Sequence, residues 1–318
     1  MTNGPKQMKN FINAFDFDQA EIKTIFDLTR KVKSNPLNFR NLLRGKTLGL
    51  IFEKPSTRTW VSFEVGFSTM GGHAIYLGPD DMELGVREEV RDVARVLARY
   101  LDLIVMRTYS HDLILQFAEF FGKPVINGLS DLEHPCQAMA DFFTMDECLD
   151  NFEDKKIAFV GDGNNVLNSL LILAARLGAH LTYATPKKFG PNQKILSRAL
   201  VEAKKTKAKL IGTNDPKKAV SGAHIVYTDV WVSMGEEDKL EKKQAFKGFQ
   251  VNQSLLKKAD KNVRLMHCLP AHRGEEVTND VIEGKHSIVF DQAENRLHVQ
   301  KAILLYLLGI GTTGHSEA

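Results

Sequence analysis

Residues 47–59 read TLGLIFEKPSTRT, an apolar run followed at once by a helix start. The run Thr47–Phe52 is short and almost entirely apolar, which predicts a buried strand. Pro55 ends this strand, and Ser56 is a good N-cap for a helix expected over Thr57–Met70. A strand that leads directly into a helix is the first half of a βαβ unit.

Apolar runs of strand length recur along the chain and alternate with helical patterns. Further strands are expected at His73–Leu77, Leu101–Arg107, Pro124–Asn127, Lys156–Val160, Leu181–Ala184, Lys209–Gly212, His224–Val230, Arg264–Cys268 and Ser287–Phe290. Helices are expected at about Arg87–Tyr100, Val166–Leu177, Gln193–Lys204 and Glu236–Lys247. This alternation predicts an α/β fold with doubly wound parallel sheets that helices cover on both faces.

The chain has 318 residues, which exceeds the usual size of one domain, so we expect two. The first domain is expected over 1–133, a linker helix over 134–150 and the second domain over 151–293. A final apolar helix, about Glu294–Leu308, is expected to pack back on the first domain, which residues 294–318 complete.

Composition argues against several classes of function. The net charge is only +3, from 42 basic and 39 acidic residues, which gives no sign of nucleic-acid or membrane binding. No apolar run reaches about 18 residues, and Met1–Phe15 lacks the apolar core of a signal peptide. The three cysteines, Cys136, Cys148 and Cys268, form no C-x-x-C pair, so we expect no thiolate metal site and a reducing, cytoplasmic location.

Two segments offer groups for binding an anion. Ser56, Thr57, Arg58 and Thr59 lie at an expected helix N-terminus, where free N–H groups and the helix dipole favour a phosphate. The alternative is a plain capped helix with a surface arginine. Arg107 ends an apolar strand and needs an anionic partner there, which a bound anion or an acidic side chain would supply equally well.

Two further polar segments begin expected helices. His134 and Gln137 are one helical turn apart and can both donate to a carbonyl oxygen, although a capped linker helix explains them too. The turn Gly161-Asp162-Gly163-Asn164-Asn165 is not a dinucleotide fingerprint, because Val166 occupies the third glycine position and no acid ends the next strand. Its Asn165 could instead hold a carboxylate.

The remaining candidates lie in the second half of the chain. Asp229 is an acid at a strand end, and Ser233-Met234-Gly235 is typical of a closing loop or of a surface turn. His267-Cys268-Leu269-Pro270 ends another strand, where Cys268 is either reactive or, more commonly, an inert buried thiol. Arg296 opens the expected last helix and could equally be an ordinary surface arginine.

Taken in this order, the motifs resemble those of the ornithine carbamoyltransferases, within the aspartate/ornithine carbamoyltransferase superfamily. The similarity covers nearly the whole chain. The Ser56–Thr59 segment, Arg107 and His134 are shared with aspartate carbamoyltransferases, whereas Ser233-Met234-Gly235 and His267-Cys268-Leu269-Pro270 indicate ornithine.

The resemblance implies carbamoyl transfer from carbamoyl phosphate to the side-chain amine of L-ornithine, giving L-citrulline and phosphate, in arginine biosynthesis or in the reverse direction of arginine degradation. It implies no metal or organic cofactor, and a homotrimer or an assembly of trimers with sites at subunit boundaries. The residues it implies for carbamoyl phosphate are Ser56, Thr57, Arg58, Thr59, Glu83, Arg107, His134, Gln137, Cys268, Leu269 and Arg296. Those it implies for ornithine are Asn165, Asp229, Ser233 and Met234, with catalytic roles for Cys268, Asp229, Arg107 and His134.

The segment Met82-Glu83-Leu84-Gly85 resembles a family loop that reaches into a neighbouring subunit's site. Glu83 departs from the uncharged side chain that is usual there. A carboxylate near a dianionic ligand is unfavourable unless it is paired, so we expect Glu83 to be protonated, to pair with Lys54 or Arg87, or to turn away.

The alternatives are a carbamoyltransferase for putrescine, aspartate or an N-acyl-ornithine, and a non-enzymatic anion-binding protein on the same scaffold. Asp229 and the Ser-Met-Gly segment suit a free α-amino group and disfavour aspartate. For an ornithine amine, whose pKa is about 10.4 like that of lysine, Asp229 and Cys268 are the candidates to orient it and receive its proton.

Overall fold

The computed structural model describes residues 9–82, 84–85, 88–149, 151–152, 155–233 and 239–311. The chain divides into unit 1, Met1–Cys136 with Arg296–Ala318, and unit 2, Gln137–Asn295. Two helices continue from one unit into the other, α5 (Pro135–Leu149) and α12 (Val289–Leu307). The domain boundaries expected after residues 133 and 293 lie a few residues before the boundaries in the structure, which follow Cys136 and Asn295. The expected linker helix belongs almost entirely to unit 2.

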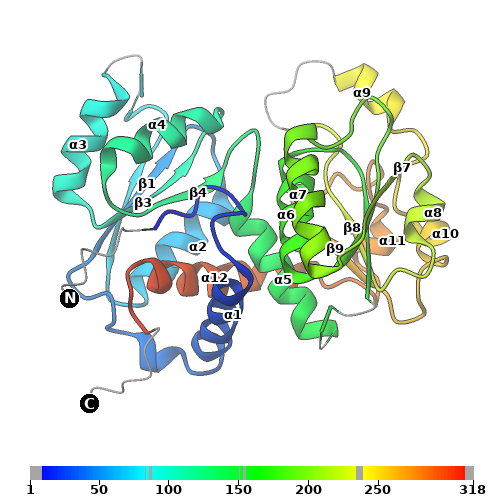
Figure 1. Ribbon diagram of the computed structural model, residues 1–318, viewed down its shortest axis with the longest axis horizontal. Helices are drawn as coiled ribbons and strands as arrows, with labels where there is room; N and C mark the ends of the chain where they lie inside the picture. The colour runs from blue at the N-terminus through cyan, green and yellow to red at the C-terminus, as the bar shows by residue number, and fades with distance from the viewer. Residues whose placement is uncertain are drawn as a thin grey trace. The chain divides into compact units, whose positions relative to one another are not determined.

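Unit 1 contains a four-stranded parallel sheet with the order β2-β1-β3-β4. Its strands are β1 (Thr47–Phe52), β2 (His73–Leu77), β3 (Leu103–Arg107) and β4 (Val125–Leu129). Its helices are α1 (Gln19–Ser34), the short η1 (Pro36–Phe39), α2 (Thr57–Ser68), α3 (Val90–Tyr100) and α4 (His111–Phe121). In Figure 1, α3 and α4 cover one face of this sheet, and α1, α2 and α12 lie on the other.

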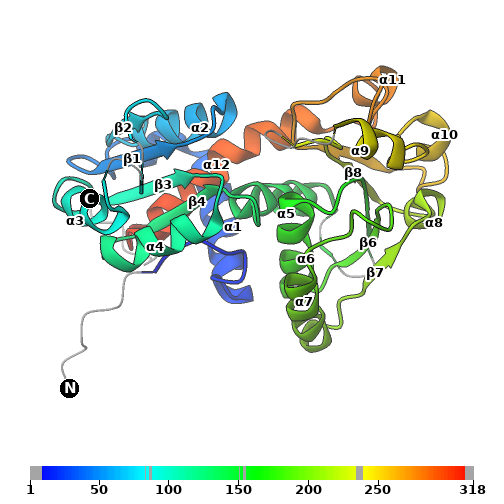
Figure 2. The same cartoon turned by 90° about the horizontal axis from the view of Figure 1, so that it is seen from above.

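Unit 2 contains a five-stranded parallel sheet with the order β7-β6-β5-β8-β9. Its strands are β5 (Lys156–Val160), β6 (His180–Ala184), β7 (Leu210–Thr213), β8 (Ile225–Thr228) and β9 (Arg264–His267). Its helices include α6 (Asn165–Leu177), α7 (Gln193–Thr206), α8 (Pro216–Val220), α9 (Lys239–Ala245), α10 (Gln253–Leu256) and α11 (Asn279–Ile282). Figures 1 and 2 show α6 and α7 together on one face of this sheet and α8 and α10 on the other.

Each sheet has one point at which the direction of strand addition reverses. In unit 1 the chain runs from β1 outward to β2 and then returns to β3 on the other side of β1. In unit 2 the reversal lies between β5 and β8. Ligands in open α/β sheets bind beyond the carboxyl ends of the strands at such reversal points.

The strands are buried because helices cover both faces of each sheet. In β1 the side chains from Leu48 to Phe52 are all shielded from solvent. Gly49 permits close packing there, since a Cβ at this position would lie 2.6 Å from Leu101 Cδ1. The two doubly wound parallel sheets confirm the fold class expected from the alternating pattern.

One expected element is wrong. Ser287–Phe290 is not a strand, because Ser287 makes only an isolated bridge to Leu265 and α12 already begins at Val289. A short apolar run is compatible with a strand or with a buried helix, and here the helical continuation decides. Arg296 consequently lies inside α12 and not at its start. Among the described residues, no helix combines the length and apolar character that a membrane span requires.

Candidate functional site

The start of α2 lies just beyond the carboxyl end of β1, at the reversal point of unit 1. Ser56 is the N-cap, and its Oγ accepts from Thr59 N at 3.4 Å and lies 3.1 Å from Thr59 Oγ1. Thr59 is fully buried, Arg58 is half-buried and Thr57 is exposed. The first turn of a helix has backbone N–H groups without helical partners, so this turn suits an anion.

Three arginines surround the buried imidazole of His134. Arg107 is the last residue of β3 and pairs in register with Phe52 of β1. Arg296 Nη2 donates to Thr59 Oγ1 at 2.8 Å, which brings the final helix to the start of α2. Burial, and then the charges of Arg296, Arg107 and Arg58, hold the pKa of His134 well below its usual value. A neutral imidazole amid positive charge can donate a hydrogen bond to a ligand oxygen.

Lys54 is a further cation in unit 1 that the sequence reading named only as a partner for Glu83. Its side chain is buried, and its Nζ lies 4.0 Å from the centroid of the Tyr109 ring. Burial and the neighbouring Arg107 lower the pKa of Lys54, while Asp131 and Glu53 act in the opposite direction. In the sequence, Lys54 stands out only as a cation directly before Pro55 and the Ser56–Thr59 segment. Its burial becomes apparent only in the folded structure.

In unit 2 the groups expected to bind an amino acid gather at the carboxyl ends of β5, β8 and β9. The register aligns Val160 with Thr228 and Thr228 with His267, so the residues that follow these strands lie at one edge. Asp229 Oδ1 lies 2.9 Å from Cys268 Sγ, and Asp229 Oδ2 accepts from Asn164 Nδ2 at 2.7 Å. The two residues named as candidates to orient the amine and receive its proton, Asp229 and Cys268, are therefore in contact.

The thiol of Cys268 is held in its protonated form. Burial and the neighbouring Asp229 carboxylate raise its pKa well above the usual value. The S–H group therefore donates to Asp229 Oδ1. A thiolate nucleophile is disfavoured at this position, and the thiol can act as a hydrogen-bond donor and as a spacer.

Asn164 was missed by the sequence reading, which selected Asn165. Asn164 is the N-cap of α6, and its Oδ1 accepts from Val166 N at 3.0 Å and from Leu167 N at 3.2 Å. The cap fixes the Asn164 amide with its Nδ2 toward Asp229. Asn165 is the first residue of the helix and is half-buried. The exact start of the helix decides between the two asparagines, and the local pattern does not define it.

The backbone after β9 is fixed by His267. Leu269 N donates to His267 Nδ1 at 2.8 Å, and the other ring nitrogen, Nε2, lies 3.0 Å from Glu276 Oε1. Leu269 has a φ of 57° and precedes a cis peptide bond to Pro270.

Of the other expected residues, Gln137 is buried, Ser233 is half-buried, and Glu83 and Met234 lie outside the described residues.

Two family models match the chain, and together they cover most of it. The carbamoyl-P binding domain of aspartate/ornithine carbamoyltransferase matches residues 9–147, and the Asp/Orn binding domain of the same family matches residues 153–307. The chain belongs to the aspartate/ornithine carbamoyltransferase family.

Relatives of this carbamoyltransferase chain include proteins named ornithine carbamoyltransferase. The chloroplastic protein of Pisum sativum is 51% identical over 95% of this chain and 81% of the relative. The protein of Archaeoglobus fulgidus is 50% identical over 95% of this chain and 98% of the relative. The solved structure from Pyrococcus furiosus is 45% identical, with a TM-score of 0.92 over 97% of this chain and 98% of that one.

Metal-ligating side chains come close together at two places in the described part of this carbamoyltransferase. One group is Asp229, His267 and Cys268, and the other is His272, Glu275 and Glu276. In the first group, both ring nitrogens of His267 already have protein partners. In the second, Glu275 pairs with Lys243 at 2.5 Å. Neither arrangement presents an open set of ligands, and the expected absence of a metal stays a prediction.

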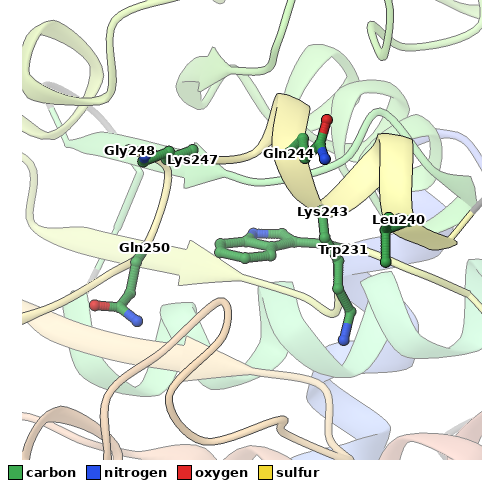
Figure 3. Close-up of a pocket in the computed structure, with 7 residues that line it drawn as sticks. All are labelled: Trp231, Leu240, Lys243, Gln244, Lys247, Gly248 and Gln250. Carbon is green, nitrogen blue, oxygen red and sulfur yellow. The ribbon is translucent and has the colours of Figure 1, made fainter.

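A separate open depression of about 590 Å³ lies in unit 2 of the carbamoyltransferase. Figure 3 shows the residues that line it, which are Trp231, Leu240, Lys243, Gln244, Lys247, Gly248 and Gln250. None of the expected site residues lines this depression, so it is not where the chemical groups gather.

Proposed function

We propose that this chain transfers the carbamoyl group of carbamoyl phosphate to the δ-amine of L-ornithine, giving L-citrulline and phosphate. The observation that carries the proposal is the Asp229 carboxylate at the reversal point of unit 2, held by Asn164 and touching the Cys268 thiol. A buried carboxylate suits a cationic amine. The relatives named ornithine carbamoyltransferase, which are about half identical over nearly the whole chain, agree with this substrate.

We assign carbamoyl phosphate to 1–133 completed by 294–318, and ornithine to 151–293, joined by the helix at 134–150. The first turn of α2 and the arginines around His134 support a phosphate site there. The groups proposed to bind carbamoyl phosphate are Ser56, Thr57, Arg58, Thr59, Glu83, Arg107, His134, Gln137, Cys268, Leu269 and Arg296. Positive charge stabilises the phosphate as it leaves, and neutral His134 donates to the carbamoyl oxygen on which charge develops.

The proposed ornithine groups are Asn165, Asp229, Ser233 and Met234. The δ-amine must lose a proton before its nitrogen attacks the carbamoyl carbon, because its pKa is about 10.4. Cys268 already holds a proton, so the Asp229 carboxylate is the better acceptor of the two. Cys268 then orients Asp229 and the amine. The C–O bond to phosphate breaks as the C–N bond forms, and the second amine proton passes to the departing phosphate.

We also propose a homotrimer or an assembly of trimers. Exposed apolar side chains on α2 support a subunit interface: Trp60, Val61 and Val65. An apolar patch of this kind on a folded chain marks a surface that another protein covers. Met82 and Leu84 of the loop expected to reach a neighbouring site pack against the core of their own unit.

A cytoplasmic location stays a prediction that the three free cysteines favour.

The test is citrulline and phosphate formation from carbamoyl phosphate with ornithine, putrescine, aspartate and N-acetylornithine offered in parallel. We expect turnover with ornithine and at least about a hundredfold lower kcat/KM with the others, since each lacks or blocks a group that the site would pair. Preference for another amine would replace the proposed substrate. Phosphate binding without turnover of any amine would favour the non-enzymatic alternative.

A further inference from the structure

A buried hydrogen-bond network in unit 2 is built on residues to which no role is assigned above. Its centre is Asp141 in α5, which is fully shielded from solvent. Asp141 Oδ1 accepts from Gln137 Nε2 at 2.8 Å and from Gln292 Nε2 at 2.7 Å. Asp141 Oδ2 accepts from the Tyr227 hydroxyl at 2.9 Å. Three side chains from three different elements therefore converge on one carboxylate.

Tyr227 connects this network to Cys268. Tyr227 lies in β8 opposite Met266 of β9, and Cys268 directly follows β9. Burial and Asp229 raise the pKa of the Cys268 thiol, and the neighbouring Tyr227 hydroxyl partly offsets this rise. Tyr227 keeps its own proton, because burial and the charge of Asp141 raise its pKa well above the usual value. The hydroxyl therefore stays protonated beside the thiol, and its one proton is donated to Asp141 Oδ2.

Gln292 connects the network to the backbone of β9. Its Oε1 accepts from His267 N at 2.9 Å, and its Nε2 lies 3.2 Å from the Tyr227 hydroxyl oxygen. Both groups on Gln292 are therefore engaged, which fixes its amide. Asp141 holds Gln292 and Tyr227 together, so it acts on the end of β9 through two side chains.

Burying a carboxylate costs free energy that its hydrogen bonds only partly recover, and an apolar group of similar size would often be as stable. A purely stabilising role is the simple explanation of such a network. That role does not explain why the network ends at Gln137 and beside Cys268, which are both groups proposed to contact the substrates.

We propose that Asp141 and Tyr227 are positioning residues for carbamoyl transfer, Asp141 by fixing the amide of Gln137 and Tyr227 by tying Asp141 and Gln292 to the end of β9 that precedes Cys268. This inference rests on the proposed function. Asp141 accepts from Gln137 Nε2, so it determines which polar atoms of that amide can serve the carbamoyl group. Tyr227 acts on the residue before Cys268 through Gln292, whose Oε1 accepts from His267 N.

Tyr227→Phe is the decisive variant, because it removes one hydroxyl and keeps the ring that stacks on Phe159 with centroids 5.7 Å apart. The matched control is Tyr183→Phe, another buried tyrosine in the same sheet that has no bond to Asp141. Losing one buried hydrogen bond corresponds to about a fivefold effect. We expect kcat for citrulline formation to fall about fivefold or more in Tyr227→Phe, with the KM for carbamoyl phosphate within about twofold of wild type.

A second readout does not depend on turnover. The rate at which iodoacetamide alkylates Cys268 is followed by mass spectrometry between pH 7 and 10. Tyr227→Phe removes a neighbour that partly offsets the raised pKa of the Cys268 thiol, so alkylation at a given pH should slow about fivefold and its pH profile should move upward. The Tyr183→Phe profile should overlay that of the wild type. An inactive wild type with this alkylation shift would sink the proposed function and leave the Tyr227–Cys268 contact standing.

Asp141→Asn tests the other arm. It keeps the volume but turns an amide toward the donors of Gln137 and Gln292, so we expect the KM for carbamoyl phosphate to rise about fivefold or more. Because this substitution can prevent folding, the kinetics of Asp141→Asn are interpreted only if its melting curve is cooperative. If it is not, the test rests on Tyr227→Phe alone. The proposal is overturned if Tyr227→Phe matches Tyr183→Phe in kcat and in alkylation, or if both variants lower only the melting temperature.

Discussion

Cys268 Sγ lies 2.9 Å from Asp229 Oδ1, and the two residues follow neighbouring parallel strands. The thiol keeps its proton, because burial and the adjacent carboxylate raise its pKa well above the usual value. The pair is therefore an ordered donor and acceptor, and each partner can be tested separately.

Cys268→Ser keeps a small donor but changes its size and acidity. A hydroxyl forms shorter hydrogen bonds than a thiol, so the Asp229 carboxylate should shift toward residue 268 and away from the amine. We expect kcat with ornithine to fall at least about tenfold, with carbamoyl phosphate binding kept. Steady-state kinetics and melting curves check this, with Cys148→Ser at an exposed cysteine as the control. Wild-type ornithine kinetics in Cys268→Ser, with only lower stability, would show that the thiol merely fills space.

Asp229→Ala should impair ornithine use more than Cys268→Ser does. It removes the carboxylate that a cationic amine would pair with in a buried place, and such a loss costs about 3–5 kcal/mol. The KM for ornithine is expected to rise about a hundredfold or more. Asn164→Ala removes one donor to Asp229 and should have a smaller effect in the same direction. If Asp229→Ala retains ornithine affinity, the amino-acid half of the site lies elsewhere.

Arg58→Ala should lower kcat/KM for carbamoyl phosphate at least about tenfold, because a charge-assisted hydrogen bond is worth about 1.5–3 kcal/mol. Arg58 is half-buried in the first turn of α2 and contributes to the positive surroundings of His134. Arg30→Ala is the control, since Arg30 is a surface arginine paired with Asp27 at 2.8 Å. Equal kinetics for Arg58→Ala and Arg30→Ala would refute the phosphate assignment.

The stability of the free protein should depend on His134 below about pH 6.5. Burial, and then Arg296, Arg107 and Arg58, lower the pKa of His134 in the folded state, so only the unfolded state takes up this proton as pH falls. Stability rises with pH wherever the unfolded state binds more protons. The stability that the folded protein gains from a neutral His134 is therefore complete above about pH 6.5, and it is lost as the pH falls below that value. The melting-temperature advantage of wild type over His134→Gln should shrink between pH 7.5 and pH 5, and an advantage that grows would mean that native His134 is protonated.

Shared sites between subunits can be tested by mixing inactive variants. Arg58→Ala is combined with a second variant in which Met82, Glu83 and Leu84 are replaced by glycine. If the loop serves a neighbouring subunit, mixed oligomers contain some sites with both an intact Arg58 and an intact loop, so activity should return after subunit exchange. Verified exchange, followed by mass measurement, without any recovery would place each complete site within one chain.

Several expected elements correspond closely to the structure, because their signals are local. The bounds of β1, β2 and β5 are the expected ones, since each is a short apolar run with a defined stop. The failure at Ser287–Phe290 shows the limit of this reasoning, because a run of only three apolar residues does not reveal whether it is extended or helical. The choice of Asn165 over Asn164 has a related cause, since the two adjacent residues differ only in their position relative to the cap.

The sequence by itself determined which elements form and which polar residues follow each strand, because periodicity, caps and breakers act over a few residues. Only the tertiary structure decided which strands become neighbours, and so which of those residues meet. Asn164 reaches Asp229 because β5 pairs with β8, and Arg296 reaches Thr59 because α12 returns to unit 1. The Asp141–Tyr227 contact joins residues that are 86 positions apart. Such contacts depend on sheet order and helix packing, which arise from burial of the whole chain and leave no local pattern.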